Sequence, residues 1–190
     1  MATPETVSFV SLAEWEKWLD QNHQSSGGVW LRIFKKDSGQ PTVTYAEAVD
    51  GALCYGWIDG LKQAHDEVSW RQRFTPRRPK SIWSKINTGH VERLISLGKM
   101  KPAGLAAIED AKKDGRWHVA YDSPSKATIP DDFVKELARN KKAKAFFATL
   151  NKTNLYAIAW RLQTARKPET RKRRMDTILE MLARGEKIHG

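Results

Sequence analysis

The sequence predicts an α+β fold, with a small, mainly antiparallel sheet packed with helices and then a C-terminal helical bundle. In the first 120 residues, stretches with the alternating pattern of strands lie among stretches with helical spacing. Beyond residue 131 the hydrophobic spacing is only helical. Residues 116–130 have little periodicity and contain Pro124 and Pro130, which is typical of a linker. We therefore expect two domains, residues 1–120 and 131–190.

The first expected elements are a helix, a strand and a second helix. Ser11 and Glu14 have the spacing of a capping box, which predicts a helix over residues 11–22. Residues 29–34 form an apolar run typical of a buried strand. Thr44 is expected to cap the second helix, which ends at Gly56.

A hairpin is expected next, with strands at 57–64 and 67–74 joined at His65 and Asp66. Its second strand alternates Val68, Trp70, Gln72 and Phe74 with Ser69, Arg71 and Arg73, as a half-buried strand does. Pairing should stop at Thr75 and Pro76, because proline lacks the backbone donor. If the hairpin pairs in the simple register, Asp59 lies near an arginine.

Helices make up the rest of the expected structure. Ser81 is predicted to cap a helix that ends before Gly98, and Pro102 to begin another that runs to about residue 114. The C-terminal domain should contain helices over residues 131–140, 142–150, 153–165 and 168–184.

Composition limits the classes of function. Hydrophobic residues make up 40% and charged residues 29% of the 190 residues, as in folded, water-soluble proteins. We expect no transmembrane segment, because no apolar run approaches the roughly 20 residues that one needs. We also expect no secretion signal, because the N-terminus has acidic residues where a signal carries basic ones. Cys54 is the single cysteine, so an internal disulfide is impossible and the cytoplasm is the expected compartment.

The net charge of +11 is concentrated at the C-terminal end. Residues 135–190 contain 15 Lys and Arg against 5 Asp and Glu, whereas the preceding 134 residues contain 18 against 17. Such a basic surface suits salt-sensitive contact with phosphate groups, with Arg166, Lys167, Arg171 and Arg174 as candidates. The alternative interpretation is an ordinary solvated helical bundle.

The segment Tyr55–Lys85 is the strongest candidate for a site, because it combines three Trp with four Arg. Arg is a planar donor that suits carboxylate and phosphate, and Trp gives it a flat surface for stacking. The predicted ligand-binding residues are Trp57, Asp59, Arg73, Arg77, Arg78, Ser81, Trp83 and Lys85. The competing interpretation makes the Trp side chains core and the Asp59 carboxylate part of a structural ion pair.

Catalytic and metal chemistry receive little support from the residue pattern. Asp59 and Tyr55 are weak candidates for a general acid and base, since no nucleophile is paired with either. The five His residues are scattered without the spacing of a zinc site, so we expect neither a metal nor a cofactor.

Three C-terminal runs, Phe146–Asn151, Ala165–Arg174 and Ile178–Gly185, resemble the C-terminal domain of the YdeI/OmpD-associated, or bacteriocin-protection, family. The upstream box Tyr55–Gly60 and the segment Arg73–Lys85 are similar to the N-terminal half of longer members. The chain departs from the family at Lys152–Trp160, where many members have an opening of the form Ser-x-x-x-Lys/Arg-Glu-Tyr. The resemblance implies a cytoplasmic bacterial protein of stress or antimicrobial-peptide tolerance, and no catalytic residues are carried over from it.

Together these observations favour a non-catalytic accessory protein that binds an anionic small molecule or an acidic partner surface through the Trp and Arg site. The first alternative is a small enzyme that uses Asp59 or Tyr55, with Arg73 or Arg77 holding a substrate carboxylate or phosphate. The second alternative is a non-specific nucleic-acid binder that uses the basic C-terminal module.

Overall fold

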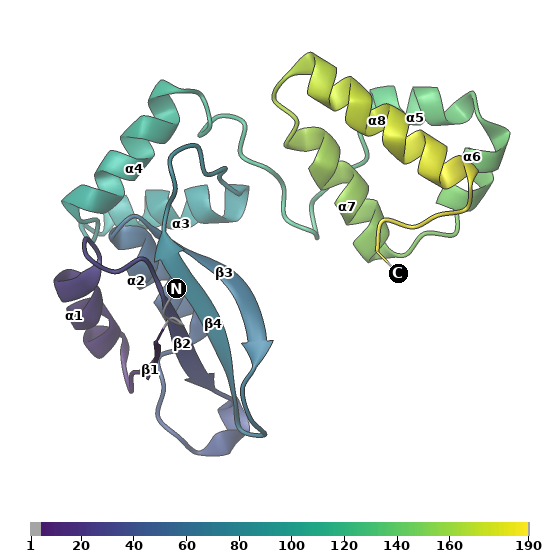
Figure 1. Ribbon diagram of the computed structural model, residues 1–190. Helices are drawn as coiled ribbons and strands as arrows, with labels where there is room; N and C mark the ends of the chain where they lie inside the picture. Colours follow the sequence, from purple (N-terminus) through teal and green to yellow (C-terminus); the bar gives the residue numbers. More distant parts are fainter. Residues whose placement is uncertain (1–4, 190) are drawn as a thin grey trace. The chain divides into compact units, whose positions relative to one another are not determined.

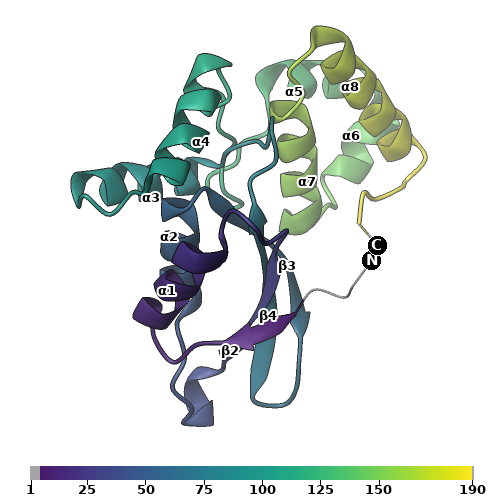
Figure 2. The ribbon, with the colours of Figure 1, turned by 60° about the vertical axis from the view of Figure 1, so that its left-hand side comes forward.

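The computed structural model describes residues 5–189 and divides them into two compact units (Figures 1 and 2). The N-terminal unit contains the residues up to Trp83 and Asn87–Val119. The C-terminal unit contains Ser84–Ile86 and the residues from Ala120 onward. The predicted α+β fold class, with helices alone at the C-terminal end, is confirmed.

The sheet of the N-terminal unit has four strands within the described residues, in the order β1-β2-β4-β3. They are β1 (Thr6–Ser8), β2 (Val29–Phe34), β3 (Trp57–Ala64) and β4 (Ser69–Pro76). The pairs β2–β4 and β3–β4 are antiparallel, as expected. The short strand β1 was not predicted, and it pairs in parallel with β2.

Helices α1 (Leu12–Asn22) and α2 (Tyr45–Cys54) lie side by side on one face of the sheet (Figures 1 and 2). Both begin at the predicted caps: the Ser11 hydroxyl accepts from the Glu14 backbone, and Thr44 forms a full capping box with Glu47. The other elements are the single 3-10 turn η1 (Lys36–Ser38), α3 (Lys85–Ser96) and α4 (Pro102–Lys113).

Aromatic side chains form much of the core between these helices and the sheet. The Trp15 ring stacks on Trp18 with centroids 5.4 Å apart, and Trp18 meets the edge of Trp57 at 5.8 Å. Trp15 also contacts Phe74 from β4, and its indole nitrogen donates to the Ala48 carbonyl at 3.0 Å. Because Trp57 is only 1% exposed, its ring belongs to this core.

The hairpin differs from the simple register in two respects. A β-bulge lies between Asp59 and Lys62, and Asp59 pairs with Phe74. Side chains alternate across a sheet, so Asp59 shares the helix-covered face with Phe74, whereas Arg71 and Arg73 lie on the opposite face. The expected proximity of Asp59 to an arginine is therefore wrong. Pairing also continues to Pro76, which is opposite Trp57.

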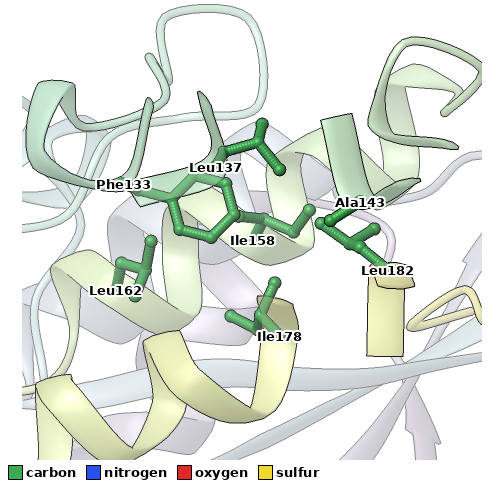
Figure 3. Close-up of a cluster of buried hydrophobic side chains, with 7 residues drawn as sticks. All are labelled: Phe133, Leu137, Ala143, Ile158, Leu162, Ile178 and Leu182. Carbon is green, nitrogen blue, oxygen red and sulfur yellow. The ribbon is translucent and has the colours of Figure 1, made fainter. Parts of the chain in front are cut away.

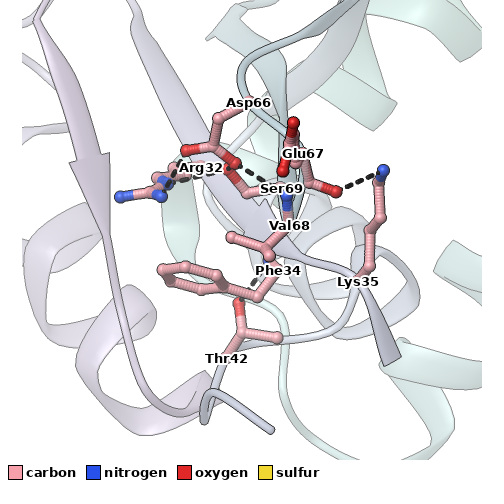
Figure 4. A network of polar contacts seen from close by, with 8 residues as sticks. All are labelled: Arg32, Phe34, Lys35, Thr42, Asp66, Glu67, Val68 and Ser69. Atoms are coloured by element: carbon pink, nitrogen blue, oxygen red, sulfur yellow. Dashed lines mark hydrogen bonds and ion pairs between the residues drawn. The ribbon is translucent and has the colours of Figure 1, made fainter. Parts of the chain in front are cut away.

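Polar contacts attach the hairpin turn to β2 and the segment after it (Figure 4). The Arg32 guanidinium donates to the Asp66 carboxylate at 2.6 Å and to the Ser69 hydroxyl at 2.9 Å. The Lys35 ammonium donates to the Glu67 carbonyl at 2.7 Å. Arg32 thus has partners within the fold.

The predicted helix start at Ser81 is wrong, because α3 begins at Lys85. Residues 78–81 form a turn in which the Ser81 amide donates to the Arg78 carbonyl at 3.0 Å. The Ser81 carbonyl accepts from Arg116 and the Ile82 carbonyl from Arg77. These two carbonyls thus have side-chain donors in place of the backbone amides of a helix.

Within the described residues, the C-terminal unit consists of α5 (Asp131–Ala138), α6 (Lys141–Phe147), α7 (Lys152–Gln163) and α8 (Pro168–Ala183), close to the expected ranges. Figure 3 shows its core, which is formed by Phe133, Leu137, Ala143, Ile158, Leu162, Ile178 and Leu182. No helix between residues 5 and 189 is both long and apolar enough to span a membrane.

Candidate functional site

The N-terminal unit contains a pocket of about 350 Å³ at the junction of α1, α2, β3, β4 and α4. Its charged and polar lining comes from His23, Gln24, Tyr55, Arg77, Arg78, Asp110 and Arg116. Its apolar lining comes from Gly56, Trp57, Pro76, Pro79, Ala103, Ala106 and Ala107. A pocket of this size is in the range that holds small organic ligands.

One face of α4 forms a wall of the pocket. The lining residues Ala103, Ala106, Ala107 and Asp110 have the spacing i, i+3, i+4 and i+7, which places them along one side of a helix. The helix approaches the end of α2 closely at Gly104, where an added Cβ would lie 2.2 Å from the Cys54 carbonyl oxygen. Glycine at this position therefore allows α4 to pack closely enough against α2 to form this wall of the pocket.

Two guanidinium groups meet the chain segment Ser81–Trp83. Arg77 lies flat against the Trp83 indole, with its Cζ 3.4 Å from the ring centroid, and donates to the Ile82 carbonyl at 3.3 Å. Arg116 donates to the Ser81 carbonyl at 2.9 Å and, through its Nε, to the Asp114 carboxylate at 2.7 Å. Protein contacts thus hold both cations in place beside the pocket.

Arg116 was missed by sequence reasoning, which assigned residues 116–130 to a linker. The side chain is 7% exposed, and residues up to Val119 belong to the N-terminal unit. Nothing in the local spacing marks this residue, because its carbonyl partner at Ser81 is 35 positions away.

The opposite part of the lining is aromatic. The rings of His23 and Tyr55 lie 5.1 Å apart at an angle of 56°. The Tyr55 hydroxyl donates to the Asp20 carboxylate at 3.3 Å, and burial, followed by the charge of Asp20, raises the pKa of Tyr55 to about 12. His23 Nδ1 lies 2.9 Å from the Leu19 carbonyl, which can only accept, so Nδ1 carries a hydrogen and donates to it.

The structure brings some of the predicted site residues together. Trp57, Arg77 and Arg78 line the pocket, as does Tyr55, and Trp83 lies beneath Arg77 with only 2% of its surface exposed. Ser81 contributes its carbonyl to Arg116.

Three predicted residues lie elsewhere. The Asp59 carboxylate accepts from the Tyr45 hydroxyl at 2.6 Å. Arg73 extends across the other face of the sheet toward the Trp30 ring, and burial lowers its pKa. Lys85 forms an ion pair with Asp122 at 2.7 Å in the C-terminal unit. None of the three lines the pocket.

The candidate basic surface of the C-terminal unit divides into two pairs. Arg171 forms an ion pair with Asp132, and Arg174 donates to the Arg161 carbonyl at 2.7 Å. Arg166 and Lys167 are exposed in the turn before α8. Two of the four residues therefore have partners within the bundle.

Residues 5–189 contain no group of three or more His, Cys, Asp or Glu side chains arranged to hold a metal ion. Cys54 is buried, and burial raises the pKa of its thiol to about 11. A thiol with that pKa is a poor nucleophile at neutral pH.

Comparison with known families divides the chain as the two units do. Residues 7–107, just over half of the chain, match a family described as Domain of unknown function (DUF8412), and the chain belongs to that family. Residues 126–185 match a second family, described as Bacteriocin-protection, YdeI or OmpD-Associated. The second match supports the predicted resemblance over the C-terminal helices and fits a bacterial accessory or stress-related protein.

The predicted resemblance of the N-terminal part is not supported in the same way, because the family that matches there is the domain of unknown function. Neither the curated proteins nor the solved structures include a significant match to the chain.

Proposed function

We propose that the protein is a non-catalytic accessory protein of bacterial stress or antimicrobial-peptide tolerance that acts in the cytoplasm and binds an anionic small molecule in the N-terminal pocket. The observation that carries the proposal is the charge of the lining. Among the described residues, three Arg line the pocket, and Asp110 is the carboxylate of the lining. Because Arg116 is paired with the neighbouring Asp114 carboxylate, the positive excess comes from Arg77 and Arg78 against Asp110. An anion in the pocket would therefore meet an excess of positive charge.

The order of the guanidinium groups beside the pocket also supports anion binding there. Arg77 and Arg116 are already ordered by indole stacking and carbonyl contacts, so a ligand would lose little side-chain entropy when it binds them. Hydrogen bonds from guanidinium to carboxylate or phosphate are charge-assisted and stronger than neutral ones.

The two alternatives receive less support. The raised pKa of Tyr55 and its hydrogen bond to Asp20 make it a weak acid or base near neutral pH, and Asp59 is outside the lining. For nucleic-acid binding, Arg171 and Arg174 already have partners within the bundle.

The test is isothermal titration calorimetry with inorganic phosphate, and the informative variant is Arg78→Ala. Arg78 is exposed at the pocket, and none of the hydrogen bonds or ion pairs described above uses its side chain. Loss of a charge-assisted hydrogen bond costs about 1.5–3 kcal/mol, so the affinity should fall at least about tenfold.

The matched control is Arg139→Ala, which removes the same charge from an exposed position at the end of α5. It should leave phosphate binding unchanged. Equal losses for the two variants would refute the proposal, and so would a failure of the unchanged protein to bind phosphate or any of the organic anions tested below.

A further inference from the structure

We infer that the ligand of the N-terminal pocket is an organic anion that carries a planar ring, with its anionic group at Arg77 and Arg116 and its ring beside His23 and Tyr55. The inference rests on the proposed function and adds the class of ligand. Three properties of the pocket support it: its length, the different chemistry of its two ends, and its volume.

The length follows from the helical wall. Ala103 and Asp110 are seven residues apart on α4, and a helix rises about 1.5 Å per residue, so this wall extends for roughly 10 Å. The Ala103 end lies at the start of β3, because Gly56 approaches the Ala103 carbonyl. Asp110 is one turn before the end of the helix, near the segment that carries Arg116. This wall is therefore long enough to contact two separate groups of one ligand.

The two ends offer different contacts. At one end, Arg77 and Arg116 both donate to carbonyls of the segment Ser81–Ile82, so their guanidinium groups are close together. Asp114 compensates part of the charge of Arg116. At the other end, Tyr55 follows α2 and its ring meets His23. Rings such as these favour another aromatic ring through stacked or tilted contacts.

The volume excludes a small inorganic ion as a complete occupant. A water molecule has a share of about 30 Å³ in the liquid, so a single phosphate would leave most of the 350 Å³ to solvent. A molecule with an anionic group and a ring would fill both ends. Two sources of this chemistry are a nucleoside monophosphate and an aromatic carboxylate.

The experiment uses calorimetry on the full chain with matched probes. Adenosine monophosphate is compared with inorganic phosphate, and indole-3-propionate with propionate, while tryptamine supplies the ring without the anion. We expect at least one ring-bearing anion to bind at least about tenfold more tightly than its ringless counterpart, and tryptamine not to bind. A larger gain in affinity for adenosine monophosphate over phosphate would indicate a phosphate ligand. A larger gain for indole-3-propionate over propionate would indicate a carboxylate ligand.

Two variants locate the ring. His23→Leu and Tyr55→Leu should reduce the affinity for the ring-bearing anion about tenfold and leave inorganic phosphate unaffected. Tyr55 is 5% exposed, so its variant is checked by thermal unfolding, and His23→Leu provides the same test at a half-buried site. Arg78→Ala should weaken both kinds of probe.

The outcomes separate this inference from the proposed function. If ringless and ring-bearing anions bind equally and Arg78→Ala weakens both, the inference fails and the proposed function stands. If ring-bearing anions bind more tightly but neither leucine variant matters, the ring lies elsewhere and the inference also fails. If no anion binds, both fail.

Discussion

The arginines of this protein differ in function because they differ in their partners. Arg77 and Arg116 converge on the carbonyls of Ser81 and Ile82 beside a pocket. Arg116 also forms an ion pair with Asp114, as Arg32 and Arg171 do with Asp66 and Asp132 away from the pocket. The residue type alone therefore does not identify a binding site, and the neighbouring carbonyl, carboxylate or indole decides what each guanidinium does.

Asp50 gives a prediction about pH. Burial would raise the pKa of its carboxyl, but hydrogen bonds from Arg93 at 2.6 Å and His90 at 2.7 Å outweigh burial and lower that pKa. A group with a lowered folded pKa stabilises the fold above its unfolded pKa and loses this contribution as the pH falls through its folded pKa. We therefore expect the free energy of unfolding to decrease below about pH 4.

Urea unfolding measures the free energy of unfolding at pH 7 and at pH 3. Asp50→Asn should reduce the difference between these two free energies. The control is Asp37→Asn, at an exposed position in η1, which should leave the difference unchanged. The explanation is wrong if Asp50→Asn has the same pH dependence as the unchanged protein.

At the residue scale, the sequence predicted part of the pocket. Tyr55, Trp57, Arg77 and Arg78 lie within one segment of the chain, so an enrichment of Trp and Arg there revealed them. His23, Asp110 and Arg116 come from other parts of the chain. They reach the pocket only through tertiary packing, which no local pattern records.

At the element scale, helix α4 depends on one close approach. Gly104 allows the helix to contact the end of α2, where an added Cβ would lie 2.2 Å from the Cys54 carbonyl oxygen and 2.7 Å from Met100. Gly104→Ala should lower the free energy of unfolding by about 1–3 kcal/mol, as other changes that overpack a core do. Gly104→Ala should also weaken the binding of phosphate in the pocket, because α4 forms one of its walls.

Gly89→Ala is the matched control, since Gly89 lies inside α3 and an added Cβ there meets nothing within 4 Å. Alanine has the higher helix propensity, so this variant should be more stable by about 0.5–1 kcal/mol. Chemical denaturation of both variants measures the difference. A destabilisation of equal size in the two would contradict the role assigned to Gly104.

The elements that the sequence predicted are those with local causes. The Ser11 and Thr44 caps and the proline starts of α4 and α8 depend on neighbouring residues, and the structure confirms them. The start of α3 was mispredicted because tertiary contacts replace the first bond of a helix from Ser81: the Ser81 carbonyl accepts from Arg116. The Lys85 amide donates instead to the Tyr121 carbonyl at 2.9 Å. The β-bulge after Asp59 also has no simple local signal.

At the scale of the whole molecule, the hydrophobic cores of the two units differ in residue composition. The N-terminal core is rich in Trp around Trp15, Trp18 and Trp57, whereas the C-terminal core of Figure 3 is mainly aliphatic. Two families match separate parts of the chain. The excess positive charge lies mostly beyond residue 134, in a different segment from the proposed pocket.

The most direct test of the pocket is a nuclear magnetic resonance titration of the arginine side-chain Nε–Hε signals with inorganic phosphate. We expect saturable shifts for Arg77, Arg78 and Arg116, which line the pocket, and little change for the exposed Arg166 and Arg173. Uniform, non-saturating shifts of all the exposed arginines would mean that phosphate only screens the basic surface, and would refute anion binding in the pocket.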